Sequence, residues 1–135
     1  MVHWAQRARE ALPRVDPARL WRGWPVGLRD GALLALLAVG ITREELPGLQ
    51  ASAVTMERGD LIVHLRREAA AWSVILPSHL GARLLAWLTE SRLWAAETPM
   101  FETRWGPLTQ FAIYKLFDRY TRQQDRRRGS RRSTS

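Results

Sequence analysis

The feature that most restricts the fold of this chain is a stretch from Val26 to Val39 in which apolar side chains occur on most sides of a helix. Its leucines are Leu33, Leu34, Leu36 and Leu37. At about 100° per residue these positions cover more than one helix face, so such a helix is typical of a protein interior rather than a surface. We therefore expect this helix, ended by Gly40, at the centre of the domain.

The residues before this helix are weakly specified. The chain begins with a short amphipathic segment whose apolar positions are Trp4, Ala8 and Leu12. Pro13 and Pro17 interrupt this pattern. A brief helical turn is expected from Asp16 to Trp21. We divide the chain into an N-terminal extension at 1–11, one domain at 12–124 and a disordered basic tail at 125–135.

A second, short helix is expected from Arg43 to Leu49. Thr42 can cap its start, and Glu45 lies three residues further on, which is the spacing of a capping box. Pro47 lies inside this segment and keeps the helix short or distorted.

Three short strands follow in the sequence. They are Ala53 to Met56, Leu61 to Leu65, and Trp72 to Leu76. The turn-forming set at 57–60 joins the first two strands, and 66–71 is either a second hairpin or a helical turn. The fold class is therefore α+β: a mainly helical domain with a small three-stranded antiparallel sheet.

Two further helices complete the domain. Pro77 and Ser78 open the first, and its apolar positions are Leu80, Leu84, Trp87 and Leu88. After a loop from Trp94 to Pro107, the second helix is expected from Leu108 to Gln124. Its expected core side is Ile113, Leu116, Phe117 and Tyr120. Its opposite side carries what we call the basic stripe: Lys115, Arg119, Arg122 and Arg126.

Positive charge is concentrated at the end of the sequence. The net charge is +8, and residues 122–135 hold six arginines against one aspartate. A cationic helix side that continues into a cationic tail is suited to a polyanion. The candidate nucleic-acid contacts are Lys115, Arg119, Arg122, Arg126, Arg127, Arg128, Arg131 and Arg132, with Arg43, Arg66 and Arg67 as a second patch. All basic residues but Lys115 are arginine, which reflects either bidentate phosphate contacts or a GC-rich coding background.

Composition excludes several other classes of protein. Cysteine is absent, so there is no disulfide or thiolate zinc site, and the three histidines are too scattered for a metal. We expect no cofactor, because no Gly-rich phosphate loop or Ser/His/Asp arrangement occurs. The longest apolar run, Gly31 to Ile41, is about half of a bilayer span. No signal peptide opens the chain, so we expect a soluble cytoplasmic protein with no membrane partner, associated with the nucleoid.

Seven tryptophans are numerous for this length. Trp72 and Trp87 fit core positions, whereas the other five lie in short or irregular segments. Those five either pack under loops, or stack on bases or fill a partner's groove.

Three sequence strings occur in the order found in a known family. They are LRDGALLALLAVGITREELPGLQ at 28–50, WSVILPSHLGARLLAWL at 72–88, and MFETRWGPLTQFAIYKLF at 100–117. Over roughly residues 12–124 the chain resembles the first half of the catalytic domain of the tyrosine recombinases, the phage integrase family. The resemblance implies a three-stranded sheet at the edge of a helical bundle, with the Thr42 turn facing the Arg67 hairpin across a basic groove.

The chain departs from the family at the catalytic positions. Thr42 stands where the resemblance implies the first catalytic arginine, with Arg43 one place along, and Arg67 stands near the catalytic lysine, a general acid. Arginine holds its proton too tightly for that role. Glu45 matches the family's acidic position. The His-x-x-Arg segment, the following His or Trp and the nucleophilic tyrosine have no counterpart, since Tyr114 and Tyr120 precede that region. We therefore expect no enzymatic activity.

The leading hypothesis is a non-catalytic protein that binds DNA largely independently of sequence, either a regulator or a relic of a mobile element. A second is a protein–protein adaptor, which docks on a recombinase or another DNA-processing or transcription machine, or self-associates through an uncovered apolar groove. A third is one half of a split recombinase. The fold could also be a small α+β domain unrelated to the family.

Overall fold

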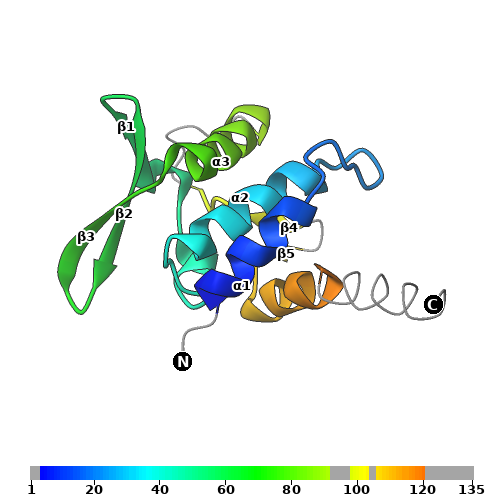
Figure 1. The fold of residues 1–135 in the computed structure, drawn as a ribbon. Helices are drawn as coiled ribbons and strands as arrows, with labels where there is room; N and C mark the ends of the chain where they lie inside the picture. Colours follow the sequence, from blue (N-terminus) through cyan, green and yellow to red (C-terminus); the bar gives the residue numbers. More distant parts are fainter. Residues whose placement is uncertain (1–3, 92–97, 104–105, 121–135) are drawn as a thin grey trace, which may run out of the picture.

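The computed structural model describes residues 4–91, 98–103 and 106–120, and it confirms an α+β fold with a three-stranded antiparallel sheet (Figure 1). The α-helices are α1 (Trp4–Ala11), α2 (Val26–Ala38), α3 (Ser78–Ser91) and a helical segment at 110–120, which we call helix 110–120. The strands of the sheet are β1 (Val54–Glu57), β2 (Asp60–Arg67) and β3 (Ala70–Ile75), and a small hairpin pairs β4 (Glu102–Thr103) with β5 (Gly106–Pro107). Short 3₁₀ turns are η1 (Leu12–Arg14), η2 (Leu46–Gly48) and η3 (Ala51–Ala53).

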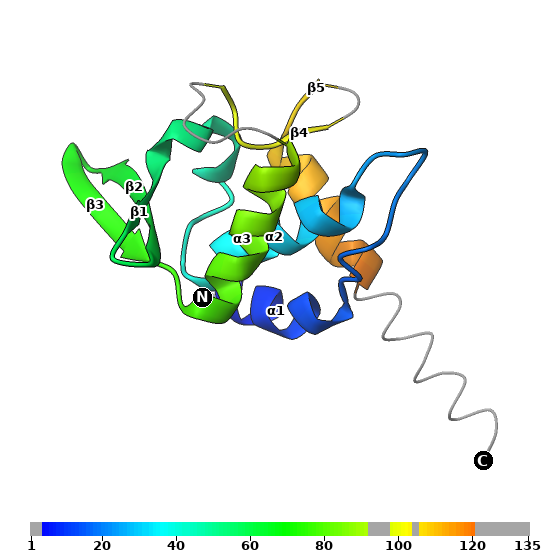
Figure 2. The same cartoon turned by 90° about the horizontal axis from the view of Figure 1, so that it is seen from above.

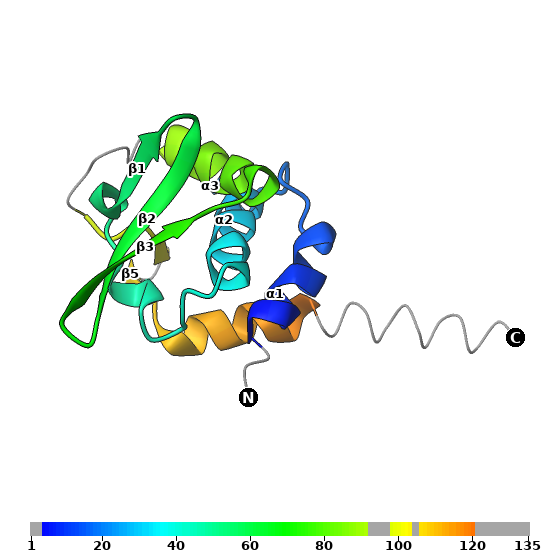
Figure 3. The same ribbon diagram turned by 60° about the vertical axis from the view of Figure 1, so that its left-hand side comes forward.

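Helix α2 lies at the centre of the molecule, as its composition predicted. Leu33, Leu34, Leu36 and Leu37 are all buried. Figures 2 and 3 show α2 enclosed by α1, α3 and helix 110–120, with the three-stranded sheet at one end of this helical body and the loop at 15–25 at the other. An apolar helix thus fixes the positions of all the elements that cover it.

The amphipathic start expected from Trp4, Ala8 and Leu12 forms helix α1, which continues into η1. Ala8 and Ala11 are buried against the core, and the Trp4 ring meets the Phe117 ring edge-on at 4.9 Å between centroids. Two small residues on one helix face allow α1 to approach α2 closely. The N-terminal extension defined by sequence therefore contributes to the core.

The loop at 15–25 has one hydrogen-bonded turn, in which the Arg19 amide donates to the Asp16 carbonyl at 3.0 Å, but no helix continues from it to Trp21. The Asp16 carboxylate accepts a hydrogen bond from the Ala18 amide at 2.9 Å, which favours a turn over a helix. Trp21 and Trp24 then exchange two backbone hydrogen bonds of 2.9 Å each. This pairing makes Trp21–Trp24 a tight hairpin.

The three predicted strands are confirmed, and the segment at 66–71 is the second hairpin rather than a helical turn. The sheet order is β1-β2-β3, with Val54 opposite Val63 and His64 opposite Ser73. Arg67 pairs with Ala70, so the turn contains only two residues.

The sheet packs on the helices through part of one face. Leu61 and Val63 are buried there, but Trp72 is 50% exposed, so its predicted core position is wrong. Trp72 lies opposite Leu65, where the hairpin extends past the helices (Figure 1). Trp87, in contrast, is buried as predicted, and its indole N–H donates to the Met100 carbonyl at 3.0 Å.

The predicted loop at 94–107 is partly paired in its described residues. The Ala51 amide donates to the Thr98 carbonyl at 3.1 Å, and the Met100 amide donates to the Leu49 carbonyl at 2.8 Å. The β4–β5 hairpin also falls in this segment. These bonds tie the segment to the chain that precedes the sheet.

Helix 110–120 begins at residue 110 rather than at Leu108, because the Thr109 hydroxyl accepts a hydrogen bond from the Ala112 amide at 3.1 Å and caps its start. Its predicted core side is confirmed, since Ile113, Leu116, Phe117 and Tyr120 are buried. The predicted end at Gln124 and the predicted disordered tail at 125–135 lie outside the described residues. Within the described part of the chain, no helix combines the length and apolarity needed to cross a bilayer.

Candidate functional site

The Thr42 turn has the predicted capping box. The Thr42 amide donates to Oε1 of Glu45 at 2.9 Å, and the Glu45 amide donates to Oγ1 of Thr42 at 3.2 Å. The predicted helix at 43–49 is only a turn followed by η2, in which Pro47 occupies an early position. Proline cannot donate the hydrogen bonds that would extend these turns into an α-helix.

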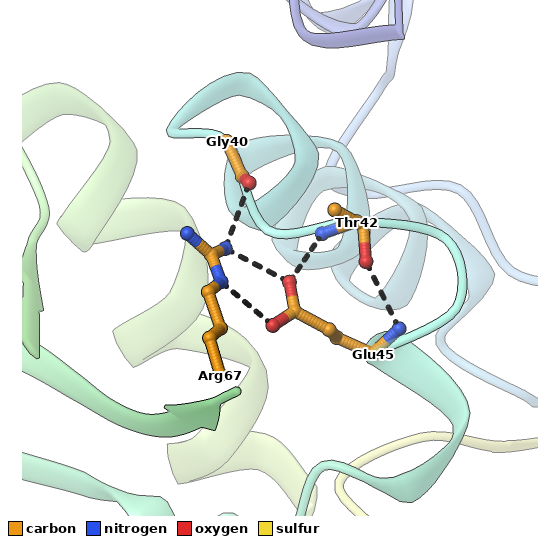
Figure 4. Close-up of polar contacts among 4 residues, drawn as sticks. All are labelled: Gly40, Thr42, Glu45 and Arg67. Atoms are coloured by element: carbon orange, nitrogen blue, oxygen red, sulfur yellow. Dashed lines mark hydrogen bonds and ion pairs between the residues drawn. The ribbon is translucent and has the colours of Figure 1, made fainter. Parts of the chain in front are cut away.

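Arg67 reaches from the end of β2 back to this turn (Figure 4). Its Nε donates to Oε2 of Glu45 at 2.8 Å, and its Nη2 donates to Oε1 of Glu45 at 2.8 Å and to the Gly40 carbonyl at 3.1 Å. The two parallel bonds make a bidentate pair between a planar guanidinium and a carboxylate. The Thr42 turn and the Arg67 hairpin are therefore directly joined.

The charges of this pair stabilise each other. Hydrogen bonding from Arg67 lowers the pKa of Glu45, although partial burial opposes the shift. Glu45 in turn raises the pKa of Arg67. At neutral pH both groups are charged, and the Arg67 guanidinium does not release a proton.

The three arginines predicted as a second DNA patch have different surroundings. Arg43 lies over the Trp4 ring, 4.0 Å from its centroid, and 3.9 Å from the Glu44 carboxylate. Arg66 is exposed, and its Nη2 donates to the Ala69 carbonyl at 3.2 Å. Arg67 is neutralised by its carboxylate partner, so Arg66 is the member with most charge facing solvent.

A second site lies at the other end of the molecule, where helix 110–120 meets the loop at 15–25 and the start of α2. It is a cleft of about 500 Å³, which we call the basic cleft. Its cations are Arg19, Arg29, Lys115 and Arg119, its aromatic residues are Trp21, Trp24 and Phe111, and its aliphatic residues are Val26, Leu33, Leu108, Ala112 and Leu116. Cationic groups thus surround an apolar interior.

A buried carboxylate, Asp30, lies against two of the four cations of the basic cleft. Asp30 is fully buried; its Oδ1 accepts hydrogen bonds from Nε and Nη2 of Arg29 at 3.2 and 3.0 Å. Its Oδ2 accepts the Tyr120 hydroxyl at 3.0 Å and lies 3.8 Å from Nη1 of Arg119. Burial, and then the Asp30 charge, raise the pKa of Tyr120, so this phenol is protonated.

Close backbone packing fixes the wall of the basic cleft. The Gly27 amide donates to the Arg19 carbonyl at 3.0 Å, and a methyl group at Gly27 would overlap the Asp16 carbonyl oxygen. Only glycine allows the loop at 15–25 to lie this close to α2. The Trp21–Trp24 hairpin lies in the segment between the two residues that this hydrogen bond joins.

The structure brings two residues of the predicted basic stripe into the basic cleft. Lys115 and Arg119 are exposed on helix 110–120, and Nζ of Lys115 lies 5.3 Å from the Phe111 ring centroid. The remaining predicted contacts, Arg122, Arg126, Arg127, Arg128, Arg131 and Arg132, lie outside the described residues.

Sequence reasoning missed the other wall of the basic cleft, which Arg19, Arg29 and the Trp21–Trp24 hairpin provide. One signal could have found it. Glycine at the second position between two tryptophans, in Trp-Arg-Gly-Trp, fits a two-residue hairpin turn.

Comparison of the chain with protein-family models, with curated proteins and with solved structures found no match. Among the described residues, no three histidine, aspartate or glutamate side chains come together as a metal site. His64 lies on the sheet between two hydroxyls, 2.8 Å from Oγ1 of Thr55 and 3.3 Å from Oγ of Ser73.

Proposed function

We propose that this protein binds DNA without cleaving it, on a fold like the first half of a tyrosine recombinase catalytic domain. The observation that carries the proposal is the set of four cations around the basic cleft, Arg19, Arg29, Lys115 and Arg119. Helix 110–120 bears two of them, and the sequence that follows it adds six arginines within 122–135. A surface of this kind favours phosphate contacts that do not depend on base sequence.

The order of elements supports the proposed fold. A central helix is followed by a capping-box turn, three antiparallel strands and two helices, as the resemblance implies. The contact of Arg67 with Glu45 brings the hairpin directly against the Thr42 turn (Figure 4), whereas the resemblance implies that the two face each other across a basic groove. The proximity of the hairpin and the turn therefore supports the proposed fold, and the groove is not part of that support.

The surroundings of three residues argue against strand cleavage. Thr42 provides no guanidinium at its position, and Arg67 is held by a carboxylate and keeps its proton. The Tyr120 hydroxyl is buried and donates to Asp30, which disfavours the phenolate that a nucleophile would need.

Binding isotherms on duplex and branched DNA at two salt concentrations test the proposal. The full chain is compared with a chain ending at Gln124. We expect the full chain to bind both DNAs, more weakly at the higher salt, with a smaller salt effect for the shorter chain. Absence of binding at the lower salt concentration would refute the proposal.

An adaptor function is the second candidate, because two apolar side chains on this end of the molecule are largely exposed. Phe111 lines the cleft and is 68% exposed, and Leu20, which precedes the Trp21–Trp24 hairpin, is 64% exposed. An apolar contact surface would have to include side chains of this kind. Light scattering separates this candidate from the first. Self-association that persists in high salt would favour an apolar interface, and a monomer with salt-sensitive DNA binding would favour the proposed function.

The split-recombinase alternative is tested with a suicide DNA substrate. On the proposed function no covalent protein–DNA adduct forms, whether or not a second polypeptide is added. A trapped adduct on Tyr114 or Tyr120 would contradict it.

A further inference from the structure

We propose that the basic cleft binds one unpaired nucleotide, with the base held between aromatic rings and a flanking phosphate held by the surrounding cations. This inference rests on the proposed function, since it takes the ligand to be nucleic acid. Binding of an unpaired base in the basic cleft would give the protein a preference for single-stranded or frayed DNA. Phosphate contacts alone would not give this preference.

The size and lining of the basic cleft suit a single base. Its volume of about 500 Å³ falls within the range of sites that bind small molecules and cofactors. Val26, Leu33 and Leu116 contribute aliphatic surface inside it. Bases in a duplex are stacked and paired, so a duplex would touch only the cations and leave this apolar interior unfilled.

Aromatic rings line the cleft from two separate elements. Trp21 and Trp24 are directly opposite each other in their tight hairpin, so their side chains leave the same face of it. They are 40% and 37% exposed, and Phe111 projects from helix 110–120 at 68% exposure. Partly exposed rings beside cations are the groups on which unpaired bases stack.

Two cations lie over these rings, and two more line the same cleft beside a buried carboxylate. Asp30 holds Arg29 by two hydrogen bonds and has Arg119 within 3.8 Å. Lys115 lies over Phe111, and Arg22 lies over Trp21 at 5.1 Å from the ring centroid. A phosphate attached to a base stacked on these rings would therefore be within reach of several positive groups.

The test compares two labelled probes, a short oligothymidylate and a duplex of the same length, by fluorescence anisotropy. In the variant Trp24→Leu with Phe111→Ala, we expect the dissociation constant for oligothymidylate to rise by about tenfold or more, because base stacking on two rings is lost. The dissociation constant for the duplex should change by less than about twofold, because phosphate contacts are kept.

Tyr114→Ala is the matched control. Tyr114 is an exposed aromatic residue on the same helix, 54% exposed, but it does not line the basic cleft. We expect it to leave both dissociation constants unchanged. If the double variant fails to fold, as judged by circular dichroism, Phe111→Ala alone carries the test, because Phe111 is largely exposed.

The outcomes separate the inference from the proposed function. Unchanged binding of oligothymidylate by the variant, with duplex binding intact, overturns the inference and leaves the proposed function standing. Failure of the full chain to bind either probe removes both. Displacement of oligothymidylate by a peptide of alternating glutamate and leucine, at equal concentration, would assign the basic cleft to a protein partner instead.

Discussion

Arg67 directs three hydrogen bonds at its own chain, to Glu45 and to the Gly40 carbonyl. The residue therefore joins the β2–β3 hairpin to the turn that follows α2. Arg66, its neighbour in sequence, points to the other side of the strand, and its Nη2 donates to the local Ala69 carbonyl. Two adjacent arginines thus have different roles, which makes them a natural pair for mutagenesis.

We expect Arg67→Ala to lower the free energy of unfolding by about 1 kcal/mol at pH 7, since the bidentate pair is partly exposed and screened. The pKa of Glu45 is lowered from its ordinary value of 4.5, so the pair stabilises the protein above that pH. The contribution is lost as pH falls through the pKa of folded Glu45. Urea denaturation between pH 7 and pH 3 should show that the difference in free energy of unfolding between the unmodified protein and Arg67→Ala decreases as the pH falls.

Arg66→Ala is the control for this experiment, with an expected change within about 0.5 kcal/mol at every pH. If the loss in free energy of unfolding caused by Arg67→Ala stays constant from pH 7 to pH 3, the ionised Glu45 carboxylate is not the partner through which Arg67 stabilises the protein.

Tyr120→Phe tests the buried carboxylate. The change removes the hydroxyl that donates to Asp30, whose side chain is fully buried. We expect the free energy of unfolding to fall by about 1.5–3 kcal/mol, the range for a hydrogen bond to a charged group. Thermal denaturation of Tyr120→Phe beside Tyr114→Phe provides the measurement, and equal melting temperatures for the two variants would exclude a structural role for this bond.

At the scale of elements, three two-residue turns share one backbone conformation, with positive φ at both central residues. These pairs are Arg22–Gly23, Arg58–Gly59 and Glu68–Ala69. Positive φ at both positions is the mark of the type I′ hairpin turn, which favours glycine at the second position. The β2–β3 hairpin, which carries Arg67, is the one with alanine there.

We expect Ala69→Gly to stabilise the protein by about 0.5–1 kcal/mol, because alanine at a φ of 65° is strained and glycine is not. Gly59→Ala, the reverse change in the β1–β2 turn, should destabilise it by a similar amount. Urea midpoints of the two variants give the comparison. A loss of stability in Ala69→Gly would show that the turn is unstrained.

Gly27→Ala and Gly31→Ala form a second matched pair, both within α2. A methyl group at Gly27 would overlap the Asp16 backbone, and we expect a loss of about 1–3 kcal/mol. A methyl group at Gly31 would lie 3.2 Å from Nη1 of Arg83, on a flexible side chain that can move. Because alanine also favours helix by about 1 kcal/mol, Gly31→Ala should be neutral or stabilising. Equal losses in differential scanning calorimetry would contradict this account.

Sequence patterns predicted some elements of this fold and not others for identifiable physical reasons. The composition of α2 determines both its helical form and its central position, because an apolar helix has no side suited to water. The Trp21–Trp24 hairpin was missed because two paired residues are too few to show the alternation of a strand. The alternation of apolar residues along the strand places Trp72 on the face of the sheet that packs on the helices. It carries no information on how far those helices extend along the sheet, and they do not cover Trp72.

The candidate site was predictable only in part. The apolar period of helix 110–120 places Lys115 and Arg119 away from the core, so this side of the basic cleft follows from sequence. Contacts between segments that are distant in the sequence cannot be predicted in this way. Glu45 and Arg67 are separated by 22 residues and Asp30 and Tyr120 by 90, and only the packing of whole elements brings each pair together.

On the scale of the whole molecule, the two candidate sites lie at different ends of α2. At the end near the sheet, Arg67 is paired with the Glu45 carboxylate. At the other end, the basic cleft has four cations against the one buried carboxylate of Asp30, around an apolar interior. Excess positive charge therefore lies with helix 110–120 and the sequence after it. This distribution is the basis for proposing that the protein binds nucleic acid at that end.

The salt dependence of the dissociation constant for duplex DNA tests this central claim most directly. If five or six cationic side chains each neutralise a phosphate, log affinity should fall with log salt at a slope of about −5, and Lys115→Gln should reduce the magnitude of that slope by about 1. Arg58→Gln, which removes an exposed arginine from the β1–β2 turn, should leave the slope unchanged. A slope near zero for the full chain, or equal slopes for the Lys115→Gln variant and the unmodified protein, would contradict the account.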